Sequence, residues 1–164
     1  MNYAYIEKDN MLNGEGLRVI LWVTGCPHHC EGCHNPWSWD PNEGKHFDSN
    51  AYLELVNELK KDYVNGITFL GGEPLAPYNL DTVTSIAKTI REEYPKKTIW
   101  CYTGYTYEDI EKYDIMKYLD VLIDGEFVKE LKDVKLHWRG SSNQRVIDVK
   151  ETRKTGKVVL YTTE

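Results

Sequence analysis

Short apolar runs alternate with amphipathic segments along most of this chain. Residues 17–23, 67–70, 98–102 and 121–123 are nearly continuous in apolar side chains, which is typical of strands covered on both faces. Segments with the apolar spacing of helices separate these runs. Because strand, helix and strand alternate in this order, the sequence predicts an α/β fold whose parallel strands are joined by right-handed crossovers.

The helices are predicted at residues 48–63, 80–94 and 107–118, with Asp48 as the N-cap of the first. Further strands are expected at residues 3–6, on an edge of the sheet, and at 145–149 and 158–161. The apolar stripes expected to face the core are Leu53, Val56 and Leu59 in the first helix and Val83, Ile86, Ala87 and Ile90 in the second.

The length of the chain limits the architecture that these elements can form. A chain of 164 residues is long enough for one domain with a buried core, so residues 1–164 are predicted to be a single domain. A complete eight-fold (β/α) barrel typically needs about 250 residues. The sequence therefore leaves room only for a partial, open barrel.

Three of the four cysteines, Cys26, Cys30 and Cys33, lie within eight residues directly after the apolar run at 17–23. Thiolates bind zinc, copper(I) and the iron of iron–sulfur clusters. A cubane cluster ordinarily takes four cysteines, so three would leave one iron open to another ligand. A closed zinc site with a nearby histidine is the alternative for the same residues.

A second motif, Gly71-Gly72-Glu73-Pro74, follows the next buried run along the chain. Glycines let a ligand approach the backbone closely, and the proline restricts Glu73 to extended conformations. Because both motifs follow parallel strands one crossover apart, they are expected to open at the same edge of the sheet. An ordinary strand-to-helix turn is the alternative interpretation.

The remaining cysteine and the histidines have simpler interpretations. Cys101 lies in an apolar run and is predicted to be a small buried side chain rather than a fourth ligand. His28 and His29 are predicted to face solvent, although an imidazole beside a cluster could tune its potential. His34 is either a site residue or a structural hydrogen-bonding group. The donor-rich residues 137–145 are either a polar connection or part of a site.

Charge and hydropathy exclude two classes of partner. The net charge of −6 argues against a broad nucleic-acid or anionic-membrane footprint. No apolar stretch approaches the roughly 18 residues of a membrane helix, and residues 1–10 lack a basic region followed by an apolar one. A cytoplasmic location is therefore expected, where reducing conditions would keep the cysteines available as ligands.

The spacing of Cys26, Cys30 and Cys33 resembles the signature of the radical S-adenosylmethionine enzymes, and the following His34-Asn35 resembles their members that activate glycyl-radical proteins. The resemblance implies one [4Fe-4S] cluster on the three cysteines, whose fourth iron is chelated by the amino and carboxylate groups of S-adenosylmethionine. One-electron reduction would then give a 5′-deoxyadenosyl radical. The implied fold is a partial, open (β/α) barrel of the radical S-adenosylmethionine type.

The same resemblance implies roles for the cofactor-binding residues. Gly71, Gly72, Glu73 and Pro74 are implied to bind the amino group of S-adenosylmethionine, largely through backbone carbonyls. The position before the third cysteine is often aromatic in the family, whereas here it is Gly32. Stacking of a side chain on the adenine is therefore not expected at this position. The backbone of Gly32, Cys33 and His34 is implied to contact the adenine edge.

Three further stretches, at residues 102–106, 124–127 and 139–145, resemble the members of this family that act on the anaerobic (class III) ribonucleotide reductase. The implied activity is abstraction of hydrogen from a backbone glycine of the large reductase subunit, after reduction by a flavodoxin-like donor. An activase of the pyruvate formate-lyase type is the nearer alternative. A zinc-binding interaction domain without enzymatic activity is the more distant one.

Overall fold

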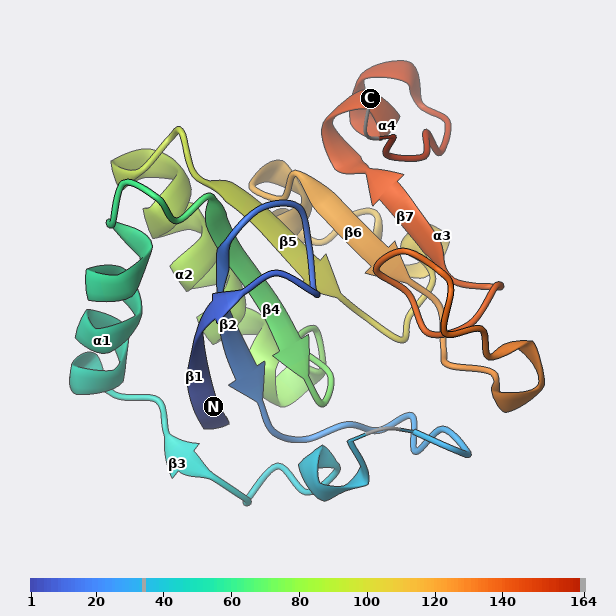
Figure 1. Ribbon diagram of the computed structural model, residues 1–164, viewed down its shortest axis with the longest axis horizontal. Helices are drawn as coiled ribbons and strands as arrows, with labels where there is room; N and C mark the ends of the chain where they lie inside the picture. The colour runs from blue at the N-terminus through green and yellow to red at the C-terminus, as the bar shows by residue number, and fades with distance from the viewer. Residues whose placement is uncertain (34, 163–164) are drawn as a thin grey trace.

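An open, mixed sheet is the centre of the fold. The computed structural model describes residues 1–33 and 35–162. Within these residues the sheet has seven strands in the order β3-β1-β2-β4-β5-β6-β7, and it is not closed into a barrel (Figure 1). The strands are β1 Asn2–Asn10, β2 Arg18–Val23, β3 Lys45–His46, β4 Gly66–Gly71, β5 Thr98–Tyr102, β6 Val121–Asp124 and β7 Arg145–Asp148.

The four central strands β2, β4, β5 and β6 run parallel to one another. This arrangement confirms the predicted α/β class. The strands that flank them, β1 and β7, are antiparallel to their neighbours, and β3 is antiparallel to β1, which the alternation of elements did not predict. The helical elements are α1 Ser49–Leu59, α2 Pro77–Glu93, α3 Tyr107–Ile110, α4 Val149–Thr155 and the 3-10 helices η1 Pro36–Ser38, η2 Asp114–Lys117 and η3 Lys129–Leu131.

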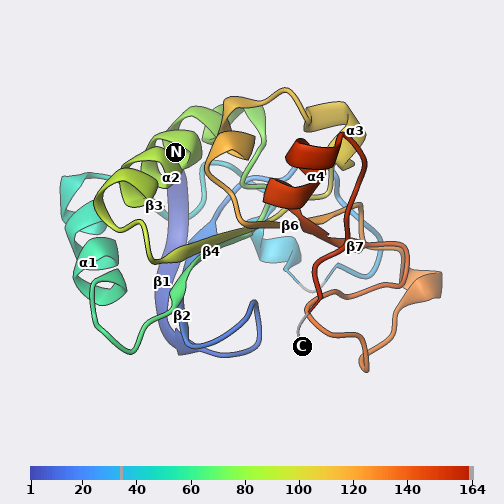
Figure 2. The ribbon, with the colours of Figure 1, turned by 90° about the horizontal axis from the view of Figure 1, so that it is seen from above.

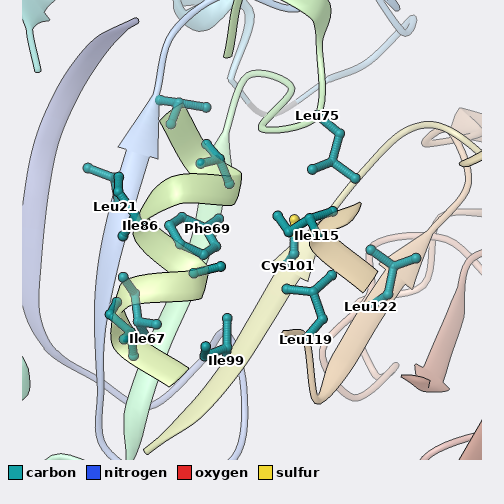
Figure 3. Close-up of a cluster of buried hydrophobic side chains, with 14 of the residues drawn as sticks. Leu21, Ile67, Phe69, Leu75, Ile86, Ile99, Cys101, Ile115, Leu119 and Leu122 are labelled. Atoms are coloured by element: carbon teal, nitrogen blue, oxygen red, sulfur yellow. The ribbon is translucent and has the colours of Figure 1, made fainter. Parts of the chain in front are cut away.

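Helices α1 and α2 lie on the same side of the sheet, where they cover the main hydrophobic core (Figure 2). Figure 3 shows Phe69 of β4 beside Ile86 of α2, and Cys101 of β5 close to Ile115. Cys101 is completely buried in this core. Its predicted place as a small buried side chain is therefore confirmed.

The first strand differs from the prediction of a short edge strand at residues 3–6. β1 extends over Asn2–Asn10 and is not an edge strand, because β3 pairs with its outer side. β3 consists only of Lys45–His46. A strand of two exposed residues has no alternation of apolar and polar side chains by which the sequence could mark it.

The first helix keeps its predicted start but not its predicted face. Asp48 is the N-cap, and its Oδ1 accepts a hydrogen bond from the backbone N–H of Ala51 at 2.9 Å. The helix ends at Leu59, and Leu53 is 56% exposed, so the predicted stripe is wrong at that position. In α2 the predicted stripe is confirmed. The buried residues of α1 are Ala51, Leu55, Glu58 and Leu59, and those of α2 include Val83, Ile86, Ala87 and Ile90.

The predicted helix at 107–118 is wrong as a continuous element. It is divided into α3 and η2, separated by an extended backbone at Tyr113. Ile110 and Ile115 are both buried but lie five residues apart, a spacing that one straight helix cannot present on a single face. The break allows both side chains to reach the core.

The end of the chain also differs from the sequence prediction. The strand expected at 145–149 is confirmed as β7, but α4 begins at Val149. The strand expected at 158–161 is wrong, because that segment makes only a single antiparallel bridge, between Ile147 and Leu160. No helix among the described residues is both long enough and apolar enough to span a lipid bilayer.

Arg18 is an unexpected member of the interior. It is completely buried at the amino-terminal end of β2. Its guanidinium donates hydrogen bonds to the carbonyls of Ile67 and Thr98, at 2.8 and 2.9 Å, and to the hydroxyl of Thr68 at 2.9 Å. The group also lies 5.3 Å from the centre of the Trp100 ring. Arg18 therefore joins three parallel strands at the end of the sheet opposite the cysteine loop.

Candidate functional site

Loops at the carboxyl ends of the four parallel strands surround one cavity. In Figure 1 the light-blue segment that follows β2 runs along the lower side of the sheet, past the ends of β2 and β4. This segment carries the three clustered cysteines, and the turn 71–74 follows β4. The two motifs meet at the same edge of the sheet, as their order predicts. The cavity wall includes Cys26, Cys30, Cys33, Gly71, Gly72 and Glu73.

The remaining predicted site residues are not part of the cavity wall that the structure describes. Gly32 and Pro74 do not line the cavity. Gly32 is exposed, and its backbone lies beside the ring of Phe127, which does line the cavity. An aromatic side chain is thus present next to Gly32 although the position itself has none. His34 lies outside the described residues.

Each cysteine sulfur is within reach of backbone N–H groups. The N–H of Asn35 donates to the Cys33 sulfur at 3.4 Å. Burial raises the pKa of the Cys26 thiol, although backbone hydrogen bonds from His28 and His29 oppose this shift. Such donors favour the thiolate form, which is the form that binds metal.

Cys30 has a different environment, because the loop after β6 reaches it. Its thiol donates to the Glu126 carboxylate at 3.5 Å. Burial and this hydrogen bond raise the pKa of the Cys30 thiol to about 11, while a backbone hydrogen bond from Phe127 opposes the shift. Within residues 1–33 and 35–162, no three His, Cys, Asp or Glu side chains converge on a point that would hold a single metal ion.

The turn after β4 is packed directly against the start of the cysteine loop. The N–H of Gly72 donates to the carbonyl of Val23 at 2.9 Å, and the N–H of Glu73 donates to the carbonyl of Gly25 at 2.7 Å. A Cβ at position 72 would lie 2.4 Å from the Gly25 carbonyl oxygen. Only glycine therefore allows the two loops to approach this closely.

The Glu73 carboxylate joins three of the loops. The side chain is 1% exposed, and its Oε1 accepts from the N–H of Gly104 at 2.6 Å and lies 2.6 Å from Nε2 of His28. Its Oε2 accepts from the Thr103 hydroxyl at 2.8 Å and from the N–H of Leu75 at 2.9 Å. One buried carboxylate thus connects the loops after β2, β4 and β5.

His28 corrects a prediction from the sequence, because its side chain is only 9% exposed and does not face solvent. Burial lowers the pKa of its imidazole, but the hydrogen bond and charge of Glu73 outweigh burial, so the pKa is raised. His29 is exposed, as predicted, and stacks on Trp39 with 4.5 Å between the ring centres. The sequence signal that could have identified His28 is its place between two cysteines, two residues from each.

The donor-rich segment 137–145 forms part of the cavity wall through Gly140 and Gln144. The Gln144 amide donates to the carbonyl of Gly125 at 3.0 Å and accepts from the N–H of Gly140 at 2.8 Å. The segment is therefore both a connection between elements and a neighbour of the candidate site. Its hydrogen bonds fasten it to the loop after β6.

The cavity has the chemistry that an iron–sulfur cluster with a further ligand requires. Three soft sulfur donors lie on one wall, and a turn of small residues lies on another. Trp39 also lines the cavity, and its indole N–H is buried without a hydrogen-bond partner among the described residues.

Comparisons with known proteins agree with this chemistry. The model of the 4Fe-4S single cluster domain family matches residues 12–147. An anaerobic ribonucleoside-triphosphate reductase-activating protein from Enterobacteria phage T4 is 44% identical over 146 residues, which cover 89% of this chain and 93% of the relative. The protein of the same name from Haemophilus influenzae is 40% identical over 148 residues, covering 88% and 96%.

A third relative with this name, from Escherichia coli strain K12, is 39% identical over 150 residues, covering 89% of this chain and 97% of the relative. The chain therefore belongs to the family of anaerobic ribonucleoside-triphosphate reductase-activating proteins.

Proposed function

We propose that this chain activates an anaerobic ribonucleoside-triphosphate reductase by forming a glycyl radical on its large subunit. The observation that carries the proposal is the cavity at the carboxyl edge of the sheet, where three cysteines face the turn formed by Gly71, Gly72 and Glu73. The names of the relatives support the identity of the partner. They give no comparable support to an activase of the pyruvate formate-lyase type.

In this proposal Cys26, Cys30 and Cys33 would hold one [4Fe-4S] cluster, and S-adenosylmethionine would be its further ligand. When bound, the cluster and S-adenosylmethionine would supply the reductive cleavage that creates a carbon-centred radical. Backbone N–H groups beside the sulfurs stabilise the charge of the thiolates. The backbone of Gly32, Cys33 and His34 is proposed to contact the adenine edge.

The turn 71–74 recognises the amino group of S-adenosylmethionine. An ammonium group needs acceptors. The Glu73 carboxylate already has four hydrogen-bonding contacts within the protein. Recognition of the ammonium therefore falls to backbone carbonyls of the turn rather than to the side chain. Gly71 and Gly72 are the candidates at the cavity wall, because the Glu73 carbonyl already accepts hydrogen bonds from Ala76 and Asn79 and Pro74 lies outside the wall.

The architecture suits a macromolecular substrate. We interpret the open sheet as the partial (β/α) barrel of a radical S-adenosylmethionine enzyme, with residues 1–164 as one domain. An open barrel leaves room for a glycine-bearing loop of the reductase to reach the cavity. A flavodoxin-like protein is the proposed electron donor, and the cytoplasm, which keeps thiols reduced, is the proposed location.

Anaerobic reconstitution with iron and sulfide, followed by reduction and electron paramagnetic resonance, tests the proposal. We expect a cubane-type signal that changes when S-adenosylmethionine is added and that is lost in Cys30→Ala. Addition of the reductase should then give a glycyl-radical signal. Peptides that carry the glycine loop of the reductase or of pyruvate formate-lyase distinguish the two activase types. Tightly bound zinc without a reducible cluster would instead favour a binding domain.

A further inference from the structure

The side chain of His28 connects the cysteine loop to the turn after β4. Its Nε2 lies 2.6 Å from Oε1 of Glu73, and the two side chains are 9% and 1% exposed. An ionised carboxylate can only accept, so the ring nitrogen Nε2 donates in this contact. Nδ1 of the same ring lies 3.9 Å from the carboxylate of Glu126, beyond hydrogen-bonding distance.

The loop after β5 provides the space that this imidazole occupies. A Cβ at position 104 would lie 2.5 Å from Cδ2 of His28, so a glycine there leaves the space that the ring occupies. The ring of Tyr105 packs edge-on against the imidazole, with 4.6 Å between the ring centres. Gly104 also donates its N–H to Glu73, the partner of His28. The position of His28 is therefore fixed by two loops that are distant in sequence.

His28 stands two residues from Cys26 and two residues from Cys30. Its own backbone N–H is hydrogen-bonded to the Cys26 sulfur. The side chain is thus anchored on the turn after β4, while the backbone of the same residue contacts a proposed cluster ligand. Movement of the imidazole would therefore act on the Cys26 sulfur through the backbone of His28.

We infer that His28 is a positioning residue. It sets the distance between the cysteine sulfurs of the cavity and the turn that recognises the amino group of S-adenosylmethionine. This inference rests on the proposed function and adds to it a residue of the cavity wall that acts through its hydrogen bond to Glu73. When a group that orients a metal ligand without binding the metal itself is removed, metal affinity or activity typically falls by about 10- to 100-fold.

Two substitutions distinguish the contribution of the hydrogen bond to Glu73 from the contribution of ring packing. His28→Phe keeps an aromatic ring against Tyr105 but has no donor for Glu73, whereas His28→Gln keeps an amide donor without the ring. His46→Gln is the matched control, because His46 is exposed in β3 and lies outside the cavity wall. Circular dichroism and the iron and sulfide content of each reconstituted protein report whether the fold and the cluster are intact.

The measurement is a titration of the reduced, reconstituted proteins with S-adenosylmethionine, followed by electron paramagnetic resonance and normalised to cluster content. We expect the apparent dissociation constant to rise about tenfold in His28→Phe, to be partly restored in His28→Gln, and to be unchanged in His46→Gln. In turnover, KM for S-adenosylmethionine should rise in the same order. General loosening of the fold would reduce the cluster content instead of changing the affinity per cluster.

Two results would overturn the inference. One is an unchanged dissociation constant in His28→Phe, and the other is an equal loss in His28→Gln and His28→Phe. If His28→Phe fails to fold, the affinity of His28→Gln decides, because a donor to Glu73 should keep it closer to the parent than His28→Ala. A parent protein whose spectrum does not respond to S-adenosylmethionine would contradict the proposed function itself, so the two failures are distinguishable.

Discussion

Arg145 holds Asp124 in a bidentate ion pair at the edge of the sheet nearest the cavity. Nε donates to Oδ1 at 3.0 Å and Nη2 to Oδ2 at 2.5 Å, and the Asp124 side chain is 1% exposed. The same carboxylate accepts from the N–H of Tyr107 at 2.8 Å. Asp124 thereby fixes the end of β6, from which Gly125 and Phe127 extend to line the cavity.

Asp124→Asn should lower the free energy of unfolding by about 2 kcal/mol, because hydrogen bonds to a buried charged group are lost. Urea denaturation under anaerobic conditions measures this change. Asp114→Asn is the control, since Asp114 pairs with Lys117 at 3.2 Å and its side chain is 75% exposed. We expect that variant to change stability by less than about 1 kcal/mol. Equal losses in the two variants would contradict the role of Asp124.

Gly72→Ala should abolish the spectral response to S-adenosylmethionine. An alanine Cβ would lie 2.4 Å from the Gly25 carbonyl oxygen, so the turn after β4 and the cysteine loop would be forced apart. Electron paramagnetic resonance with and without S-adenosylmethionine measures the effect. Gly156→Ala provides the comparison, because a Cβ there meets nothing within 4 Å. It should cost about 1–2 kcal/mol for its left-handed backbone and leave the spectral response intact.

The sequence was sufficient to predict the central strands and the meeting of the two motifs. The apolar runs that became β2, β4, β5 and β6 are buried, and parallel strands bring their carboxyl ends to one edge. Cysteine spacing and the Gly-Gly-Glu-Pro turn are local signals. The roles assigned to these residues in binding the cluster and S-adenosylmethionine stay predictions.

The environments of His28 and Arg18 could not be predicted, because their partners are distant in sequence. His28 and Glu73 are 45 residues apart, and Arg18 and Thr98 are 80 residues apart. A polar loop residue and a single charge inside an apolar run both look like surface groups when read locally. Only the assembled sheet brings their acceptors within hydrogen-bonding distance.

Arg18→Met should lower the free energy of unfolding by about 3 kcal/mol, because buried acceptors on β4 and β5 lose their donor at about 1–3 kcal/mol each. Urea denaturation measures the loss, with Lys45→Met, at an exposed position in β3, as the control. Arg18 lies at the opposite end of the strands from the cysteine loop. The response of the cluster to S-adenosylmethionine should therefore be retained in whatever fraction of Arg18→Met remains folded. A stable variant that has lost this response would contradict a purely structural role.

The hydrogen bonds of the Asp120 carboxylate predict how the stability of the fold depends on pH. Its carboxylate accepts from Arg91 at 2.5 Å, from the backbone N–H of Ile99 at 2.8 Å and from Lys150 at 2.9 Å. Burial alone would raise the pKa of this carboxyl, but the hydrogen bonds from Lys150, Arg91 and Ile99 outweigh burial and lower it. A carboxyl whose pKa is lower in the folded state stabilises the fold above its unfolded pKa of about 3.9. That contribution is lost as the pH falls through the folded value.

The free energy of unfolding of the parent and of Asp120→Asn should therefore differ by about 2 kcal/mol at pH 7, where the carboxylate is ionised and its hydrogen bonds are charge-assisted. Below about pH 4 the carboxyl of the unfolded parent chain takes up a proton while the folded one is still ionised, so the difference shrinks. The two stabilities should converge as the pH falls through the folded pKa. Urea denaturation at pH 7, 5, 4 and 3 measures the difference. A difference that stays constant from pH 7 to pH 3 would show that ionisation of Asp120 contributes nothing to the fold.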